Sequence, residues 1–515
     1  MKRIFTLLSL MLAFAFGVQA QNGTVTGRVV DENGLGLPGA NVFIESLSIG
    51  APSDVDGDYV LFNVPAGQHS LTISFIGYQM VQQSITVPDG AAIEVNIKME
   101  PGAQVGDAIL VLGDRLKGQA KALNKQRAKL NVTNVVAADQ IGRFPDANIG
   151  ESLRRVPGIA VQNDQGEARD IVLRGLARQL NSVMLNGDRV PSAEGDNRNI
   201  QLDLIPSDMI QTIEVNKTLT PDMDADAIGG SVNLVTRAAP NGLRVSGTAA
   251  SGFNFIRNNP TFIGNIVLGN RFFDNKVGVV LGASYNNQDY GSDNFEGEWT
   301  EDDGQIFMEE FDIRRYDVQR IRRSFSASVD YKINPSNSLT FRTIYNWRDD
   351  WENRFRFRVT DVEADGNGGF VGAIERQTKG GIGSDRVDFR RLEDQRVYNA
   401  SLMGEHIIAN KVELTWMASY ARASEDRPNE RYIGYIVEDI PISVDVSNPE
   451  TPLLGALNAA DVAPSNFELD ELTEENRFTR ERNYNARIDL KIPLTAFSQP
   501  GFIKFGGRYR RLEKL

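Results

Sequence analysis

The second half of the chain consists of segments in which apolar and polar residues alternate one by one. In segment 324–331, one face carries only serine and aspartate, and the other carries Phe325, Ala327, Val329 and Tyr331. The same alternation returns in 411–420 and 483–492. Because successive side chains of a β-strand point to opposite faces, each segment predicts a strand with one apolar face and one polar face.

The connections between these segments differ strongly in length. We expect brief connections at 270–276, 334–337 and 409–410, and long ones at 286–320, 349–395 and 422–482. An antiparallel sandwich also alternates, because one face of its sheets meets water. Short turns at one end and long loops at the other favour an outer-membrane barrel instead. Loops that long are unusual in a compact soluble domain.

Residues 1–20 predict a secretory signal peptide. Lys2 and Arg3 precede an apolar run from Ile4 to Phe16, and Val18-Gln19-Ala20 offers a small-residue cleavage site. A membrane-spanning helix is the alternative, but the run is shorter than the roughly 20 apolar residues that a bilayer requires.

Composition argues against several classes of function. The chain has no cysteine, which excludes disulfides and thiolate metal sites. Its formal net charge of -13 argues against a nucleic-acid partner. The two histidines, His69 and His406, have no partner at ligand spacing. We therefore expect no metal, no cofactor and no enzymatic activity.

Segment 141–237 contains the most specific sequence motifs of the chain. It contains IGRFPDANIGESLRRVPGIAVQ, then DIVLRGLARQLNSVMLNGDRV, then MIQTIEVNKTLTPDMDADAIGGSVNLVTR. This segment resembles the plug domain of a TonB-dependent outer-membrane receptor. The resemblance implies active import across an outer membrane, with the TonB energy-coupling protein, outer-membrane lipid and a small or oligomeric extracellular ligand as partners.

Residues 23–100 contain short strand-like runs separated by turn signals, which suggest a small β-sandwich. The wording GTVTGRVVDENGLGLPGANVFIES, followed by SDVDGDYVLFNVPAGQHSLTISFIGYQ, resembles the carboxypeptidase-regulatory-like domain. The following linker contains a brief apolar run that resembles the TonB box: Asp107, Ala108, Ile109, Leu110 and Val111. An exposed extended segment of this kind can add as a strand to a partner's sheet. An ordinary linker strand, or a strand packed on the plug, is the alternative.

Six residues match the family's plug pattern, and we expect them to serve plug folding and contact between plug and barrel: Arg174, Gly175, Glu214, Gly229, Gly230 and Asn233. Glycines permit close backbone approach, and buried charges need partners. The alternative is that some of these contacts break and re-form during transport.

Ligand-facing candidates come from two regions. The resemblance implies that plug loop 186–199 points towards an external cavity, which selects Arg189, Asp196, Asn197 and Arg198. Segment 289–312 is rich in acidic residues interleaved with aromatics, among them Trp299, and such residues can stack on sugars or attract cations. A plain solvated loop remains the alternative in both regions.

The expected fold is mainly β, with an N-terminal β-sandwich, a mixed α/β plug, and the N-terminal part of a roughly 22-stranded transmembrane β-barrel. About ten strand candidates lie between Leu243 and Arg510, so we expect the C-terminal part of the barrel to be absent and this chain alone not to transport. The expected domains are a signal peptide (1–20), the sandwich (21–100), a linker with TonB box (101–134), the plug (135–240) and the partial barrel (241–515).

The expected function is TonB-dependent import of a specific ligand, carbohydrate-like or a metal chelate. A surface binding or signal-sensing receptor, whose sandwich docks a partner protein, is the alternative. A passive porin is a third possibility, and it would not need the segment 107–113.

Overall fold

Strands make up most of the computed structural model, which describes residues 22–54, 56–102, 115–137, 148–192, 194, 200–302, 304–381, 390–409, 411–496 and 499–515. The expected signal peptide and the expected TonB box, Asp107 to Val111, lie outside the described residues, as do Asp196, Asn197 and Arg198. The α-helices of the described part are α2 (Arg115–Ala128) and α4 (Ile149–Leu153). No described helix is long and apolar enough to cross a membrane.

The N-terminal segment forms a β-sandwich. One sheet has the order β4-β1-β7, with β8 also paired to β1, and the other has the order β3-β2-β5-β6. The elements are β1 (Asn22–Val30), β2 (Asn41–Ile44), η1 (Glu45–Leu47), β3 (Ile49–Pro52), β4 (Asp58–Pro65), β5 (Gly67–Ser74), β6 (Val81–Val87), β7 (Ala92–Glu94) and β8 (Ile97–Lys98). Apolar side chains of both sheets, such as Leu61 and Ile73, are buried between them. Their burial holds the two sheets together.

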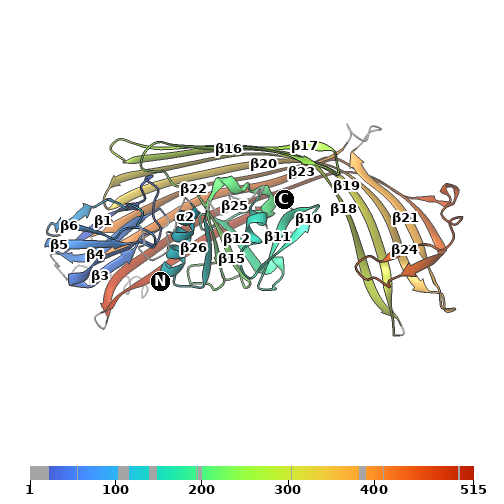
Figure 1. Ribbon diagram of the computed structural model, residues 1–515, viewed down its shortest axis with the longest axis horizontal. Helices are drawn as coiled ribbons and strands as arrows, with labels where there is room; N and C mark the ends of the chain where they lie inside the picture. Colours follow the sequence, from blue (N-terminus) through green and yellow to red (C-terminus); the bar gives the residue numbers. More distant parts are fainter. Residues whose placement is uncertain are drawn as a thin grey trace, which may run out of the picture.

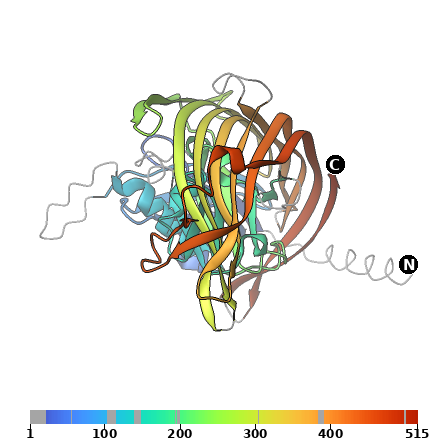
Figure 2. The same cartoon turned by 90° about the vertical axis from the view of Figure 1, so that its right-hand side faces the viewer.

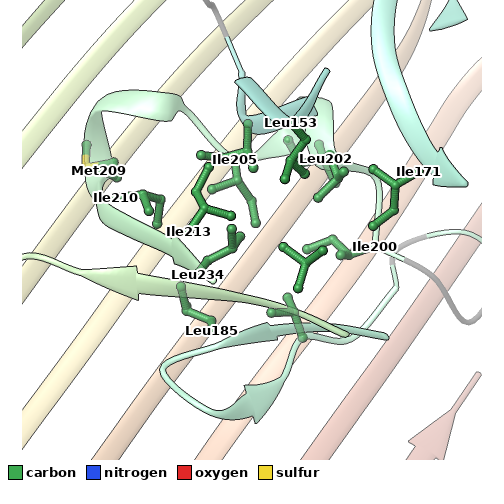
Figure 3. Close-up of a cluster of buried hydrophobic side chains, with 14 of the residues drawn as sticks. Leu153, Ile171, Leu185, Ile200, Leu202, Ile205, Met209, Ile210, Ile213 and Leu234 are labelled. Atoms are coloured by element: carbon green, nitrogen blue, oxygen red, sulfur yellow. The ribbon is translucent and has the colours of Figure 1, made fainter. Parts of the chain in front are cut away.

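The plug is built on a five-stranded sheet of order β13-β12-β15-β14-β9, beside the hairpin β10-β11. Its elements are β9 (Thr133–Ala137), α4, β10 (Ile159–Asp164), β11 (Glu167–Leu173), η2 (Arg178–Leu180), β12 (Asn181–Leu185), β13 (Asp188–Arg189), η3 (Leu202–Leu204), η4 (Ser207–Met209), β14 (Ile210–Asn216) and β15 (Gly230–Thr236). Figure 3 shows its apolar core, where Leu153 of α4 and Leu202 of η3 lie near Ile213 and Leu234 of the sheet. A mixed α/β unit is present, as the sequence predicted.

Residues 244–514 contribute one 11-stranded antiparallel sheet that bends around the plug (Figure 1). Its order is β16-β17-β18-β19-β20-β21-β23-β25-β26; β22 pairs with β20 and β23, and β24 pairs with β23. The strands are β16 (Arg244–Asn254), β17 (Asn259–Phe272), β18 (Val277–Asp302), β19 (Gln305–Asn334), β20 (Asn337–Ala364), β21 (Phe370–Gly381), β22 (Arg391–Ile408), β23 (Val412–Asp445), β24 (Leu453–Ala456), β25 (Glu468–Ala496) and β26 (Gln499–Lys514), with η5 (Pro464–Asn466) before β25. Figure 2 shows the sheet as a curved wall with the plug on its concave side.

The two faces of this sheet are opposite in character to those of a soluble sandwich. The convex face carries exposed apolar side chains, among them Phe325 at 56% and Ile488 at 52% exposure. The concave face buries charged side chains, including Arg320, Arg322 and Arg348 at 1 to 2%. A water-soluble sheet would bury its apolar face. The observed faces are those of a transmembrane barrel wall, apolar outside and polar inside.

The predicted long loops are wrong for most of their length. Strands β18 and β19 run for 26 and 30 residues and pair with each other as far as Asp302 and Gln305. Strand β23 runs for 34 residues. Beyond the apolar band both faces of these strands are largely polar, so the alternation fades although the backbone ladder continues. Near their far end the extended strands share an apolar cluster that includes Phe307, Phe311, Val359 and Ile374.

Candidate functional site

The linker helix α2 is joined to the plug sheet by a buried ion pair. Lys125 Nζ of α2 lies 2.7 Å from Glu214 Oε1 of β14, and the two side chains are 5% and 4% exposed. Lys129 approaches the other carboxylate oxygen at 3.2 Å. Burial alone would raise the pKa of Glu214, but the charges of Lys125 and Lys129 outweigh burial and lower it to about 2. Burial lowers the pKa of Lys125 as well. We take the pair as ionised at neutral pH, because two ammonium groups face one carboxylate.

Asn233 of β15 connects this ion pair to the turn between β12 and β13. Its amide nitrogen donates to Glu214 Oε2 at 3.3 Å, and its amide oxygen accepts from the backbone N–H of Gly187 at 2.8 Å. Asn186 and Gly187 form this turn with φ of 53° and 81°. A movement of α2 that pulled on Glu214 would therefore act on the neighbouring strands β14 and β15.

Arg174, Gly229 and Gly230 meet at one corner of the plug. Arg174 and Gly175 both have positive φ, 54° and 76°, and the Arg174 guanidinium donates to the carbonyl oxygens of Gly229 at 3.0 Å and Ile228 at 3.1 Å. A Cβ atom on Gly230 would lie 2.2 Å from Leu173 Cδ2, closer than any real contact. All six residues that match the plug pattern thus make or border contacts within the plug.

A second set of buried charges joins the plug to the concave face of the sheet. Glu167 of β11 accepts from Arg320 at 2.6 Å and from Arg322 Nη1 at 3.1 Å. Asp203 of η3 accepts from Arg348. The charges of Arg322 and Arg320 outweigh the effect of burial and lower the pKa of Glu167 to about 2. Because an unpaired buried charge is very unfavourable, removal of either partner should weaken the contact between plug and sheet.

Two alternate aspartates of the plug loop 220–227, Asp222 and Asp224, make a third set of contacts. Asp222 pairs with Lys504 at 2.8 Å and Arg487 at 3.3 Å, and Asp224 with Arg508 at 2.5 Å and Arg510 at 2.9 Å. These four cations lie on β25 and β26. We call this set of contacts the aspartate clasp. The sequence gave no sign of these contacts between loop and sheet.

The described ligand candidates lie in different parts of the fold, one in the plug and one in the large sheet. Arg189 of β13 pairs with Asp226 at 2.7 Å and its side chain is 14% exposed. Trp299 lies three residues before the end of β18 and is 46% exposed. A ligand that contacts Arg189 must compete with Asp226, whereas Trp299 is directly accessible.

The sandwich docks on the end of the sheet, a contact that the sequence did not reveal. Asp58 accepts from Lys332 at 2.9 Å and Asp56 from Arg342 at 2.9 Å. The backbone N–H of Asn241, just before β16, donates to Gly34 O at 2.7 Å. In Figure 1 the sandwich accordingly lies at one end of the concave side of the sheet, beyond the plug. Parts of the sandwich, the loop 220–225 and the sheet together line a cavity of about 1520 Å³.

The described residues contain no group of three or more His, Asp or Glu side chains that could hold a metal ion. The aspartates of the turn 54–58 serve the fold instead, since Asp54 Oδ1 accepts from the backbone N–H groups of Asp56 and Asp58. What the site offers is a set of ion pairs that join helix, plug, sandwich and sheet.

Two family models match the chain. One, described as the TonB-dependent Receptor Plug Domain, matches residues 125–231, and one described as a CarboxypepD_reg-like domain matches residues 25–111.

Curated relatives match over limited stretches. TonB-dependent receptor P39 of Formosa agariphila is 27% identical over 176 residues, which is 34% of this chain and 16% of that protein. Vitamin B12 transporter BtuB of Photobacterium profundum is 31% identical over 121 residues, or 23% of this chain and 20% of that protein. The matched stretches thus span a fifth or less of these relatives.

Solved structures with a similar arrangement include two receptors. The pyoverdine outer membrane receptor FpvA of Pseudomonas aeruginosa has a TM-score of 0.40 at 12% identity, covering 76% of this chain and 58% of that one. BauA, the ferric preacinetobactin receptor of Acinetobacter baumannii, has a TM-score of 0.36 at 14% identity, covering 74% and 58%.

Proposed function

We propose that this chain, a TonB-dependent receptor of the outer membrane with a plug and a CarboxypepD_reg-like domain, actively imports a specific extracellular ligand. The ligand is carbohydrate-like or a metal chelate. The energy-coupling protein TonB pairs with Asp107 to Val111 as an added strand and pulls on it. No catalytic step is involved.

The observation that best supports this proposal is the buried contact between Lys125 and Glu214. Helix α2 begins at Arg115, shortly after the expected box, and contacts strand β14 of the plug sheet through this ion pair near its C-terminal end. A pull on residues 107–111 is therefore transmitted to the plug sheet, whose displacement opens a path along the barrel wall.

Two changes in the box test the proposal. Proline at Ile109 and Val111 removes two backbone donors that strand addition requires, so binding of the periplasmic domain of TonB and ligand-dependent growth should both be lost. Proline at Gln104, outside the box, is the control. Growth should also stop when the proton gradient of the inner membrane is abolished. Uptake that continues without the gradient would refute active import.

The ligand-facing candidates belong to the same proposal. Arg189, Asp196, Asn197, Arg198 and Trp299 contact the ligand before transport. Trp299→Ala should reduce ligand binding without loss of folding, because its side chain is 46% exposed. If Trp299→Ala binds every imported ligand with unchanged affinity, Trp299 does not contact the ligand.

A second candidate function is favoured by the docking of the sandwich. Asp56 and Asp58 hold the sandwich against Arg342 and Lys332, and a sensor domain would exchange this contact for one with a partner protein. Deletion of residues 23–100 separates the two functions. Unchanged uptake with lost signalling favours the sensor, and lost uptake favours a role in transport.

A further inference from the structure

The convex face of the sheet carries a row of aromatic side chains with a row of arginines beside it. In five strands an aromatic residue and an arginine lie two positions apart, and the arginine is the one nearer the end of the sheet away from the sandwich. The pairs are Phe325 and Arg323, Tyr398 and Arg396, Tyr420 and Arg422, Tyr484 and Arg482, and Tyr509 and Arg511. Residues two apart on a strand share a face. We call the five arginines the arginine row.

The arginine row lies at the outer boundary of the apolar band. Arg422 is about ten residues along β23 from its start at Val412, the number that a strand needs to cross the hydrocarbon layer. The aromatic rings lie two residues closer to the apolar band, with centroids 6.2 Å apart for Tyr398 and Tyr420 and 5.2 Å apart for Tyr420 and Tyr484. Such rings are typical of the interface between lipid tails and headgroups.

Three arginines of the row have carboxylate partners. Arg323 pairs with Asp349 at 2.7 Å, Arg396 with Asp394 at 2.5 Å, and Arg511 with Glu513 at 2.8 Å. The first two also stack on the ring of Trp347, at 4.4 and 4.9 Å from its centroid. These arginines are neutralised within the protein.

Arg422 and Arg482 are different. They stand directly opposite each other on the neighbouring strands β23 and β25. Neither forms an ion pair with any carboxylate of the described residues, and Glu513, which is opposite Arg482 on β26, pairs with Arg511 instead. Like charges directly opposite on a sheet repel each other. The repulsion is removed if one anion binds both guanidinium groups.

We propose that Arg422 and Arg482 bind the phosphate of a phosphorylated lipid headgroup in the outer leaflet. The inference rests on the proposed placement of the sheet in the outer membrane. A phosphate offers several oxygen atoms to two guanidinium forks, and at this level the lipid headgroups are the anions in contact with the convex face. The acyl chains of the same lipid would lie over the exposed apolar band below, where Ile488 is 52% exposed.

The test uses the protein extracted from membranes in a neutral detergent and titrated with phosphatidic acid, with bound lipid counted by native mass spectrometry. Replacement of both arginines by glutamine, Arg422→Gln with Arg482→Gln, should weaken binding about thirtyfold, since each arginine near a membrane surface contributes about fivefold. The matched control is Arg315→Gln with Arg477→Gln. It removes the same charge from exposed, ion-paired arginines of the extended strands, 61% and 55% exposed.

Several outcomes would overturn the proposal. Equal losses in the control variant would show a general effect of charge. Equal binding of phosphatidylcholine would show that an anionic headgroup is not required, and displacement of the lipid by millimolar inorganic phosphate would favour free phosphate. If the glutamine variant fails to fold, Arg422→Lys with Arg482→Lys keeps the charge and removes the forked geometry. Binding that stays at the original strength in this variant would also contradict the inferred contact. Failure of import with intact lipid binding would leave this proposal standing and refute only the proposed function.

Discussion

Lys125 and Glu214 are 89 positions apart in the sequence, yet their charged groups lie 2.7 Å apart in a site almost closed to water. The pair joins the helix that follows the expected TonB box to strand β14 of the plug sheet. Because it is buried, its two charges depend on each other. It therefore holds the helix in place only while both are ionised.

The first prediction concerns removal of one charge. Glu214→Gln leaves Lys125 buried without a carboxylate, so the plug should lose about 3 to 5 kcal/mol of stability. The loss should appear as a lower urea concentration at which the plug becomes sensitive to protease. Glu100→Gln is the control, because Glu100 and its partner Lys98 are 61% and 57% exposed and such a pair contributes under about 1 kcal/mol. Equal effects of the two substitutions would contradict a structural role for the buried pair.

A second prediction follows from the lowered pKa of Glu214. Its pKa is about 2 in the folded plug and about 4.3 in an unfolded chain. A lowered pKa stabilises the folded state fully above the unfolded value, and this stabilisation is lost as pH falls from about 4.3 to 2. Cleavage next to α2 by an acid-active protease should therefore accelerate below pH 4. The pKa of Glu167 is lowered to about 2 as well, so the comparison with Glu214→Gln isolates the contribution of the linker contact. If cleavage in the Glu214→Gln variant has the same pH profile, Glu214 is not the group responsible.

The third prediction tests the docked sandwich. Gly34 has φ of +77°, and a Cβ atom there would lie 2.3 Å from Asn241 O, so Gly34→Ala should push the sandwich off the sheet. Hydrogen exchange at the Asn241 amide, which donates to Gly34, should then be much faster. Gly90→Ala is a matched control, because Gly90 also has positive φ, +63°, but has no atom within 4 Å of the added group. Exchange that accelerates equally in both variants would point to loss of sandwich folding rather than of docking.

The sequence predicted those parts of the sheet in which one face is apolar and the other polar. Alternation placed Phe325 and Tyr331 together on one side, and both are exposed on the convex face. Alternation failed in segments 286–320, 349–395 and 422–482, where neither face is consistently apolar and where backbone pairing continues without a side-chain pattern. The predicted loops there are mostly strands.

The sequence selected a few of the residues in these buried contacts but not the contacts themselves. The resemblance to plug domains selected Glu214 and Asn233, which do meet at 3.3 Å. It gave no partner for Glu214 in the linker, because Lys125 belongs to a lysine-rich run with no single distinguished position. The docking of Asp58 on Lys332 spans 274 positions, and only the fold brings such groups together.

The last prediction concerns the aspartate clasp. Asp224 is 11% exposed and faces both Arg508 and Arg510, whereas Asp222 is 34% exposed and faces Lys504 and Arg487. Asp224→Asn should therefore lower the stability of the docked plug by about 2 to 3 kcal/mol, and Asp222→Asn by about 1 kcal/mol or less. The urea concentration that makes loop 220–227 sensitive to protease measures both.

Salt distinguishes the two aspartates. In about 1 M salt the Debye length falls to about 3 Å, so the effect of Asp222→Asn should nearly vanish. The effect of Asp224→Asn should persist, because a largely buried pair is screened much less. If both effects disappear together in high salt, the clasp is a surface contact and does not retain the plug against the barrel wall. If Asp224→Asn alone persists, loss of this contact is a required step in any displacement of the plug, because the carboxylate must separate from two arginines of β26 before loop 220–227 can move.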